Sequence, residues 1–320
     1  MIELCDTDKD SIKVLYDSLD KTKMRTLSTG TVVEEQMKQF ALSREHEDLS
    51  HSLAFDVNDN YWKSYFTDAE IKEIKEFNVV RLPVLPYDVK TYFDELKATS
   101  NADLHDKVNA TQFEPNADCK WIQDSYNSCF RLFKSGFFPL NDVTEQGIGK
   151  GIYGEKLWSK KGLFVQDKSW GAEVGCGECG LVGGVNITKE LQDSGFKMPK
   201  VMKDMMFRLA SESPAVMNKI CLSGFYIGQN VLKLLILDCP AGYVTKYDAF
   251  NPVDYPMEES KIRHQLTAVL KMILSARLIM QNIKQKIGDD DSEVALGRGR
   301  HMIMQPSFVP NVEYNKKRKF

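Results

Sequence analysis

Five short segments rich in β-forming residues, separated by turn residues, constrain the fold of this chain most strongly. They are Lys161–Gln166, Ala172–Val182, Lys219–Ile227, Val231–Asp238 and Tyr243–Phe250. Gly228-Gln229-Asn230 is typical of a hairpin connection, and Cys239-Pro240-Ala241-Gly242 is typical of the next turn. One helix over about 201–211, opened by Pro199, separates the first two strands from the last three. The pattern predicts an α/β protein with a mixed central sheet of about five strands flanked by helices.

Helical patterns surround these strands. Thr67-Asp68-Ala69-Glu70 has the form of a capping box, and apolar residues follow it at helical spacing. The prolines of Leu82-Pro83-Val84-Leu85-Pro86 then interrupt the pattern. Further helices are expected over Tyr87–Leu96, over Lys120–Lys134 and, as a long amphipathic C-terminal helix, over about 258–286.

Composition and residue pattern divide the sequence into three parts. Residues 1–117 are expected to form a helical N-terminal region, and residues 118–287 an α/β core. Residues 288–320 are expected to be a basic, flexible and disordered tail. With 320 residues, the chain is long enough for one large core or for two.

Composition favours an intracellular protein with no membrane partner. No apolar run approaches the roughly 20 residues that cross a bilayer. The start, MIELCDTDKD, lacks the basic beginning and apolar centre of a secretory signal. Seven cysteines, an odd number and mostly scattered, favour a reducing compartment without a disulfide framework.

The net charge of −3 conceals an asymmetry. Residues 1–110 hold 14 Lys/Arg against 22 Asp/Glu, whereas residues 261–320 hold 12 Lys/Arg against 5 Asp/Glu. Nonspecific nucleic-acid binding is therefore expected at the C-terminal end, through tail residues Arg298, Arg300, Lys316, Lys317, Arg318 and Lys319. The final basic tetrad also resembles a nuclear localisation signal, which favours the nucleus slightly over the cytoplasm.

The segment Trp170–Gly184, WGAEVGCGECGLVGG, holds the remaining candidate chemistry. Cys176 and Cys179 have CxxC spacing, which occurs in zinc knuckles and redox pairs. No second knuckle is evident, and a redox pair would stand at the start of a helix. A β-strand fits the segment better, with Cys176 and Glu178 on one face. If Gln166 pairs with Gly171, Glu178 stands opposite Ser159, within two residues. Glu178 is then either a salt-bridged strand residue or a catalytic carboxylate.

Several blocks of the chain resemble a family of uncharacterised proteins of early-branching filamentous fungi. They are SREHEDLSHSLAFDVNDNYWKSYFT, RLFKSGFFPLNDVTEQGIGKGIYGEKLWS, EVGCGECG, FKMPKVMKDM and LILDCPAGYV, and they span most of residues 43–280. The central region is similar in layout to PD-(D/E)XK nucleases. This resemblance implies a helix, a strand ending in Asp, a partner strand with Glu-x-Lys, then a helix and further strands around a divalent metal.

The resemblance gives roles to particular residues. Glu178 takes the place of the motif glutamate and would bind Mg²⁺. Gly180 stands where the motif lysine is expected, so Lys189 on the neighbouring helix is the candidate catalytic substitute. No Asp stands in Ser159–Gly162, where the motif requires one. Asp167 is a second candidate metal ligand, although it lies at the other end of the hairpin. Mg²⁺ is implied only if this site is intact.

Three functional hypotheses remain open. The first is a degenerate, inactive nuclease-like domain with weak nonspecific nucleic-acid binding; if active, it would be a Mg²⁺-dependent nuclease. The second is a non-enzymatic module that binds an unknown protein through the helical N-terminal region. Trp62, Tyr65 and Phe66 are candidates for that interface or for the core. The third is a zinc-dependent fold.

Overall fold

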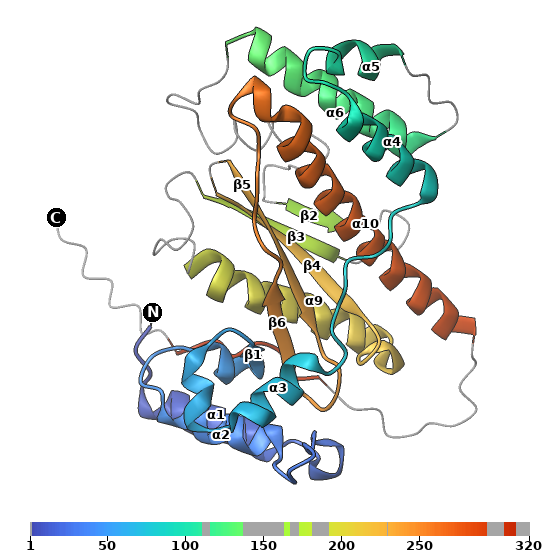
Figure 1. Cartoon of the computed structure of the whole chain (residues 1–320). Coiled ribbons are helices and arrows are strands. Elements are labelled where there is room, and N and C mark those ends of the chain that lie inside the picture. The colour runs from blue at the N-terminus through green and yellow to red at the C-terminus, as the bar shows by residue number, and fades with distance from the viewer. Residues whose placement is uncertain are drawn as a thin grey trace, which may run out of the picture.

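Helices cover both faces of one mixed β-sheet in the computed structural model of the chain (Figure 1). The structure describes residues 2–110, 116–136, 163–166, 173–180, 192–228, 230–292 and 304–311. A helical N-terminal region, a mixed central sheet and a long C-terminal helix are all present, which confirms the predicted α/β class.

The sheet has seven strands in the described part of the chain, in the order β1-β6-β5-β4-β3-β2, with β7 paired to β5. They are β1 (Ala54–Asp56), β2 (Leu163–Gln166), β3 (Glu173–Gly180), β4 (Cys221–Gly228), β5 (Val231–Asp238), β6 (Thr245–Ala249) and β7 (Val253–Asp254). β3 is parallel to β4 and β1 to β6, and the other pairs are antiparallel. Gly228 pairs with Val231, which confirms the predicted hairpin. The sequence does not predict β1 and β7, because such short strands show no alternation of their own.

The α-helices that the structure describes are α1 (Asp6–Asp17), α2 (Val33–Ser43), α3 (Asp68–Glu76), α4 (Tyr87–Ala98), α5 (Leu104–Ala110), α6 (Ala117–Lys134), α9 (Met198–Glu212) and α10 (Ile262–Ser292). The predicted capping box opens α3, since the backbone amide of Thr67 donates to Glu70 Oε2 at 2.7 Å and Glu70 N donates to Thr67 Oγ1 at 3.3 Å. Asn116 caps α6 in the same way, accepting from Cys119 N at 2.9 Å. These side chains satisfy amides that a helix start leaves without partners.

The glycines of β3 and β4 let two helices approach the sheet closely. A Cβ atom on Gly175 would lie 2.3 Å from Met280 Cε of α10. A Cβ atom on Gly224 would lie 3.0 Å from Met202 Sδ of α9, on the other face. Gly175 and Gly224 therefore serve helix–sheet packing, because only a residue without a side chain leaves room for these methionines.

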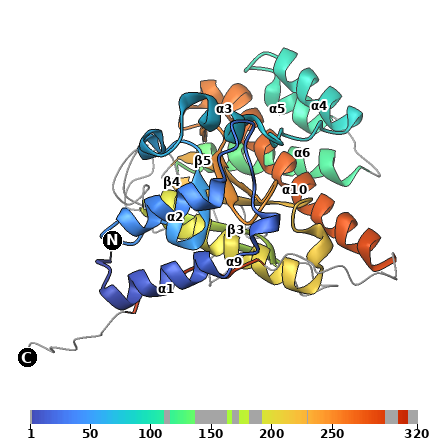
Figure 2. The ribbon, with the colours of Figure 1, turned by 90° about the horizontal axis from the view of Figure 1, so that it is seen from below.

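Two buried clusters hold the fold together. One lies between the sheet and helices α4, α5, α6, α9 and α10. The other joins α1, α2, β1 and α3 to Tyr243, Val244 and Phe308. Figure 1 shows α1–α3 at one end of the sheet and α4–α6 at the other, and Figure 2 views the molecule from the end where α1 and α2 lie. The region before residue 117 thus contributes to both clusters, and β1 extends the central sheet.

α10 is the helix of the described part whose length and composition would suffice to cross a membrane, over Glu259–Ile287. In its most apolar window 67% of the residues are buried inside the fold. A helix buried to this extent is typical of the core of a soluble protein. The finding agrees with the expectation that the chain has no membrane partner.

Two parts of the predicted tail belong to the folded structure. α10 continues to Ser292, beyond the boundary drawn at residue 288. Residues 304–311 form an extended segment in which Met304 and Phe308 are buried. For these residues the prediction of a disordered tail is wrong, because their apolar side chains and backbone amides find partners on distant parts of the chain.

Candidate functional site

Glu178 lies near the end of β3, where it forms an ion pair with Lys197. The distance from Lys197 Nζ to Glu178 Oε2 is 2.8 Å, and the side chains are 53% and 32% exposed respectively. Lys197 ends the short turn η4 (Asp193–Lys197), which leads into α9. The contact is that of a salt-bridged strand glutamate at the surface of the sheet.

The predicted register of the β2–β3 hairpin is wrong. Gln166 pairs with Glu173 instead of Gly171, and Leu163 pairs with Gly177. An irregularity between Val165 and Gln166 shifts the register further. The partner predicted for Glu178, near Ser159, lies outside the described residues.

The other predicted site residues also lie outside the described residues. These are Asp167, Lys189, Arg298, Arg300, Lys316, Lys317, Arg318 and Lys319. Lys197, which the sequence reasoning did not single out, is the lysine of the neighbouring helical segment that contacts Glu178. Within the described part, no three His, Cys, Asp or Glu side chains lie close enough together to hold a metal ion. A Mg²⁺ site at Glu178 therefore stays a prediction.

Cys176 is buried in β3 against α9, near Gly224. Burial raises the pKa of its thiol to about 12. A reactive thiol needs the opposite shift, because the thiolate is the nucleophile. Cys176 thus serves as a small apolar side chain in the sheet cluster.

The aromatic residues proposed for an N-terminal interface belong to the core. Trp62 and Phe66 are 2% and 3% exposed, and the Trp62 ring stacks on Phe55 at 4.4 Å between centroids. Tyr65 is partly buried, and its hydroxyl lies 2.9 Å from Ser43 Oγ. Any protein partner must therefore meet other residues of this region.

Most basic residues of α10 have partners within the chain. Arg277 pairs with Asp118, and Arg263 donates to the carbonyl of Thr99 at 2.8 Å. Lys271 lies over the Phe93 ring, 5.2 Å from its centroid. Lys286 donates to the carbonyl of Lys219, and Lys261, just before the helix, pairs with Glu258. The helix therefore presents few free cations for nucleic acid.

Residues 77–87, which we call the strap, link α3 to α4 without joining the sheet. Apolar side chains of the strap remain exposed: Phe77, Val79, Leu82, Val84 and Tyr87. Val84 and Tyr87 are 88% and 84% exposed. Clustered exposed apolar side chains are unusual on a soluble surface and mark interaction sites.

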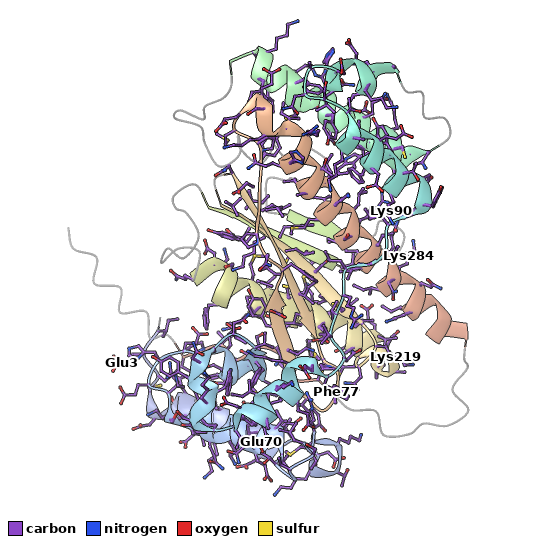
Figure 3. The ribbon with its side chains drawn as sticks, viewed as in Figure 1. Glu3, Glu70, Phe77, Lys90, Lys219 and Lys284 are labelled. Atoms are coloured by element: carbon purple, nitrogen blue, oxygen red, sulfur yellow. The ribbon has the colours of Figure 1, made fainter. Side chains whose placement is uncertain are left out.

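A cleft of about 730 Å³ lies between the strap, α10 and the region where β4 begins and β5 ends. Arg81, Lys219 and Lys286 contribute positive charge to its lining, and Asp238 is its acidic residue. Arg81 and Lys219 are exposed, and neither side-chain cation has an ion pair or hydrogen bond in the described part of the chain. Figure 3 shows Lys219 on the same side of the molecule as Lys90 and Lys284, with Phe77 at the start of the strap.

An ion pair beneath the strap holds its first residues. Lys246 Nζ lies 3.7 Å from Asp238 Oδ2 and donates to the carbonyl of Phe77 at 2.8 Å. Both side chains are almost fully buried, and burial raises the pKa of Asp238 to about 6. Arg25 adds a second contact, with its guanidinium 4.5 Å from the centroid of the Phe77 ring. The strap is therefore fixed at its start. Val80 and Leu85 pack against the core, whereas the five apolar side chains named above are exposed.

Asp238 also borders a smaller cavity of about 140 Å³ on the other side of Val80. Lys75, Lys246 and Asp248 supply the other charged side chains of that cavity. Neither oxygen of Asp238 has a hydrogen bond within the described residues. The buried charge of Asp238 is therefore compensated by its ion pair with Lys246.

No family model, no curated protein and no solved structure matches this chain.

Proposed function

We propose that this chain is a non-catalytic binding protein, and that the strap cleft holds an acidic, apolar segment of a protein partner. The observation that carries this proposal is the combination of exposed apolar side chains on the strap with the unpaired cations of Arg81 and Lys219. Apolar side chains supply the contact area of a protein interface, and charges at its rim select a complementary partner. The strap lies within the N-terminal region for which the sequence raises a protein-binding hypothesis.

Exchanging both Arg81 and Lys219 for glutamate should weaken the binding of an acidic, apolar peptide at least about tenfold, a loss of about 1.4 kcal/mol. The probe is a short fluorescein-labelled peptide of alternating glutamate and leucine, titrated with the full chain and followed by fluorescence anisotropy. Binding to the unmodified chain should weaken as salt is added, because exposed charges are screened.

The matched control exchanges Lys13 and Lys21, two exposed residues at the α1 end of the molecule, for glutamate. This control makes the same change in net charge and should bind the peptide as the unmodified chain does. Equal binding by the Arg81→Glu, Lys219→Glu chain would exclude the cleft. If a single-stranded oligonucleotide binds in place of the peptide and loses affinity in that variant, the cleft is a nucleic-acid site.

A second candidate function is the inactive nuclease-like domain with weak nucleic-acid binding. It is supported by the order of α6, β2, β3, α9 and β4 and by the contact between Glu178 and Lys197. Weak, salt-sensitive DNA binding through the basic tail stays a prediction, which deletion of residues 298–320 tests. If binding to a labelled duplex is unchanged by that deletion, the tail does not carry it.

Replacing Glu178 by glutamine should change the free energy of unfolding by less than about 1 kcal/mol, because exposed ion pairs contribute little. Urea denaturation measures this change, and Lys197→Met should give a loss of the same small size. A Mg²⁺-dependent nuclease assay on the same proteins should show no cleavage. Cleavage that disappears in Glu178→Gln would instead establish an active metal site.

A further inference from the structure

Residues 304–311 contact three separate parts of the chain. The backbone amide of Ser307 donates to Asp204 Oδ1 of α9 at 2.9 Å. The amide of Phe308 donates to Ser52 Oγ at 3.0 Å, next to β1. The amide of Asn311 donates to Asp8 Oδ1 of α1 at 2.8 Å. In Figure 1 the segment passes between α9 and the N-terminal helices.

These contacts resemble those of a bound peptide more than those of a secondary-structure element. The segment has no helix and no strand, and its amides donate to side chains instead of a backbone ladder. Ser307 Oγ adds a hydrogen bond to the carbonyl of Lys200 at 3.1 Å. Side-chain acceptors and a pocket for one residue are typical of extended peptide recognition.

Two buried apolar side chains anchor the segment, Met304 and Phe308, which are 3% and 8% exposed. The Phe308 ring packs edge-on against His51 with 5.7 Å between centroids. The next residue, Val309, is 76% exposed and makes no such contact. Burial of one side chain beside an exposed one gives the groove selectivity for the residue at position 308.

The segment is held only marginally. Burial of Met304 and Phe308 contributes about 1.5–3 kcal/mol for each side chain, and each hydrogen bond contributes about 0.5–1.5 kcal/mol net. Ordering each residue of an extended segment opposes this by about 1–2 kcal/mol. The two contributions are of similar size, so the segment can leave the groove at modest cost.

We propose that residues 304–311 are a tethered ligand of a peptide groove formed by Asp8, His51, Ser52, Lys200 and Asp204. The groove takes an extended segment in which a hydroxyl-bearing residue is followed by phenylalanine. A partner protein with such a segment binds there when the tethered segment leaves. This inference concerns a surface separate from the strap cleft and does not depend on the function proposed for that cleft.

The test uses full-length chains and a fluorescein-labelled peptide of residues 303–312. Two variants weaken the tethered segment without altering the groove. Phe308→Ala removes one of the two anchors, and Ser307→Pro removes the amide and hydroxyl that bind α9. Each variant chain should bind the peptide about twofold more tightly than the unmodified chain, because a marginally held tether leaves the groove free only about half of the time.

The matched control is Val309→Ala, which should behave like the unmodified chain because that side chain faces solvent. A peptide that carries Phe308→Ala should bind none of the chains. Thermal unfolding identifies a variant that fails to fold, and Ser307→Pro decides the result if Phe308→Ala unfolds. The proposal is overturned if folded variant chains do not bind the peptide, or if the unmodified chain binds it equally well.

Discussion

Replacing Lys246 by methionine is expected to lower the free energy of unfolding by about 3–5 kcal/mol at pH 7. The exchange leaves the Asp238 carboxylate buried without its cation, and it removes the donor from the carbonyl of Phe77. An unpaired buried charge is far more costly than a lost surface pair. Urea denaturation of the two chains measures the difference.

The pH dependence of this loss identifies Asp238 as its origin. The pKa of Asp238 in the folded chain is about 6, above the ordinary value of 3.8. Below pH 6 the folded chain binds this proton and the carboxyl is neutral, so the missing cation matters less. Removing Lys246 raises this pKa further, because Lys246 is among the groups that lower it. The loss caused by Lys246→Met should therefore be largest well above pH 6 and should shrink as the pH falls to 5.

Two further chains separate the ion pair from general effects. Exchanging both Asp238 for asparagine and Lys246 for methionine should recover most of the stability, because no buried charge remains. Lys75→Met, an exposed lysine beside the smaller cavity, should change the free energy of unfolding by less than about 0.5 kcal/mol. If Lys246→Met is as mild as Lys75→Met, the pair does not hold the strap.

The sequence predicts the elements whose signals are local. The capping box at Thr67 and the hairpin at Gly228 each lie within a few residues, and both are confirmed. The strand at EVGCGECG is also confirmed, but its Gly175 fits Met280, which comes from a helix far away in sequence. The sequence pattern indicates that this strand needs small residues, but it does not show which side chains pack against them.

The features that sequence reasoning missed depend on distant residues. Lys197 lies 19 residues from Glu178, and the hairpin register that would place Glu178 depends on an irregularity at Gln166. The strap cleft assembles Arg81, Lys219 and Asp238 from three elements. The run of apolar residues with two prolines at 82–86 was the available signal, because such a segment can join neither a helix nor a central strand.

A second buried lysine, Lys203, is expected to have a large effect on the free energy of unfolding. Lys203 of α9 is fully buried, and its ammonium donates to the carbonyl of Ser52. Burial lowers its pKa from 10.5 to about 7, while the nearby Asp204 carboxylate opposes that shift. The low value follows from placing a charge where its direct hydrogen-bond partner is a neutral carbonyl.

The sign of the resulting pH dependence follows from proton counting. Between about pH 7 and pH 10 the unfolded chain keeps the Lys203 proton and the folded chain has released it. Lys203 therefore makes the folded state more stable as the pH rises, by up to about 1.4 kcal/mol per pH unit. Replacing Lys203 by methionine removes this rise, because methionine does not titrate.

The measurement is the difference in free energy of unfolding between the unmodified chain and Lys203→Met, taken by urea denaturation from pH 6 to pH 10. Groups common to both chains cancel in this difference, so its slope reports Lys203 alone. The offset at a single pH is less informative, because the Ser52 carbonyl loses its donor at a cost of about 1–3 kcal/mol. Lys219→Met, at an exposed lysine, is the control for the removal of a lysine charge at the surface. If the stability of the unmodified chain and that of Lys203→Met change in parallel from pH 6 to pH 10, the buried lysine keeps its proton throughout.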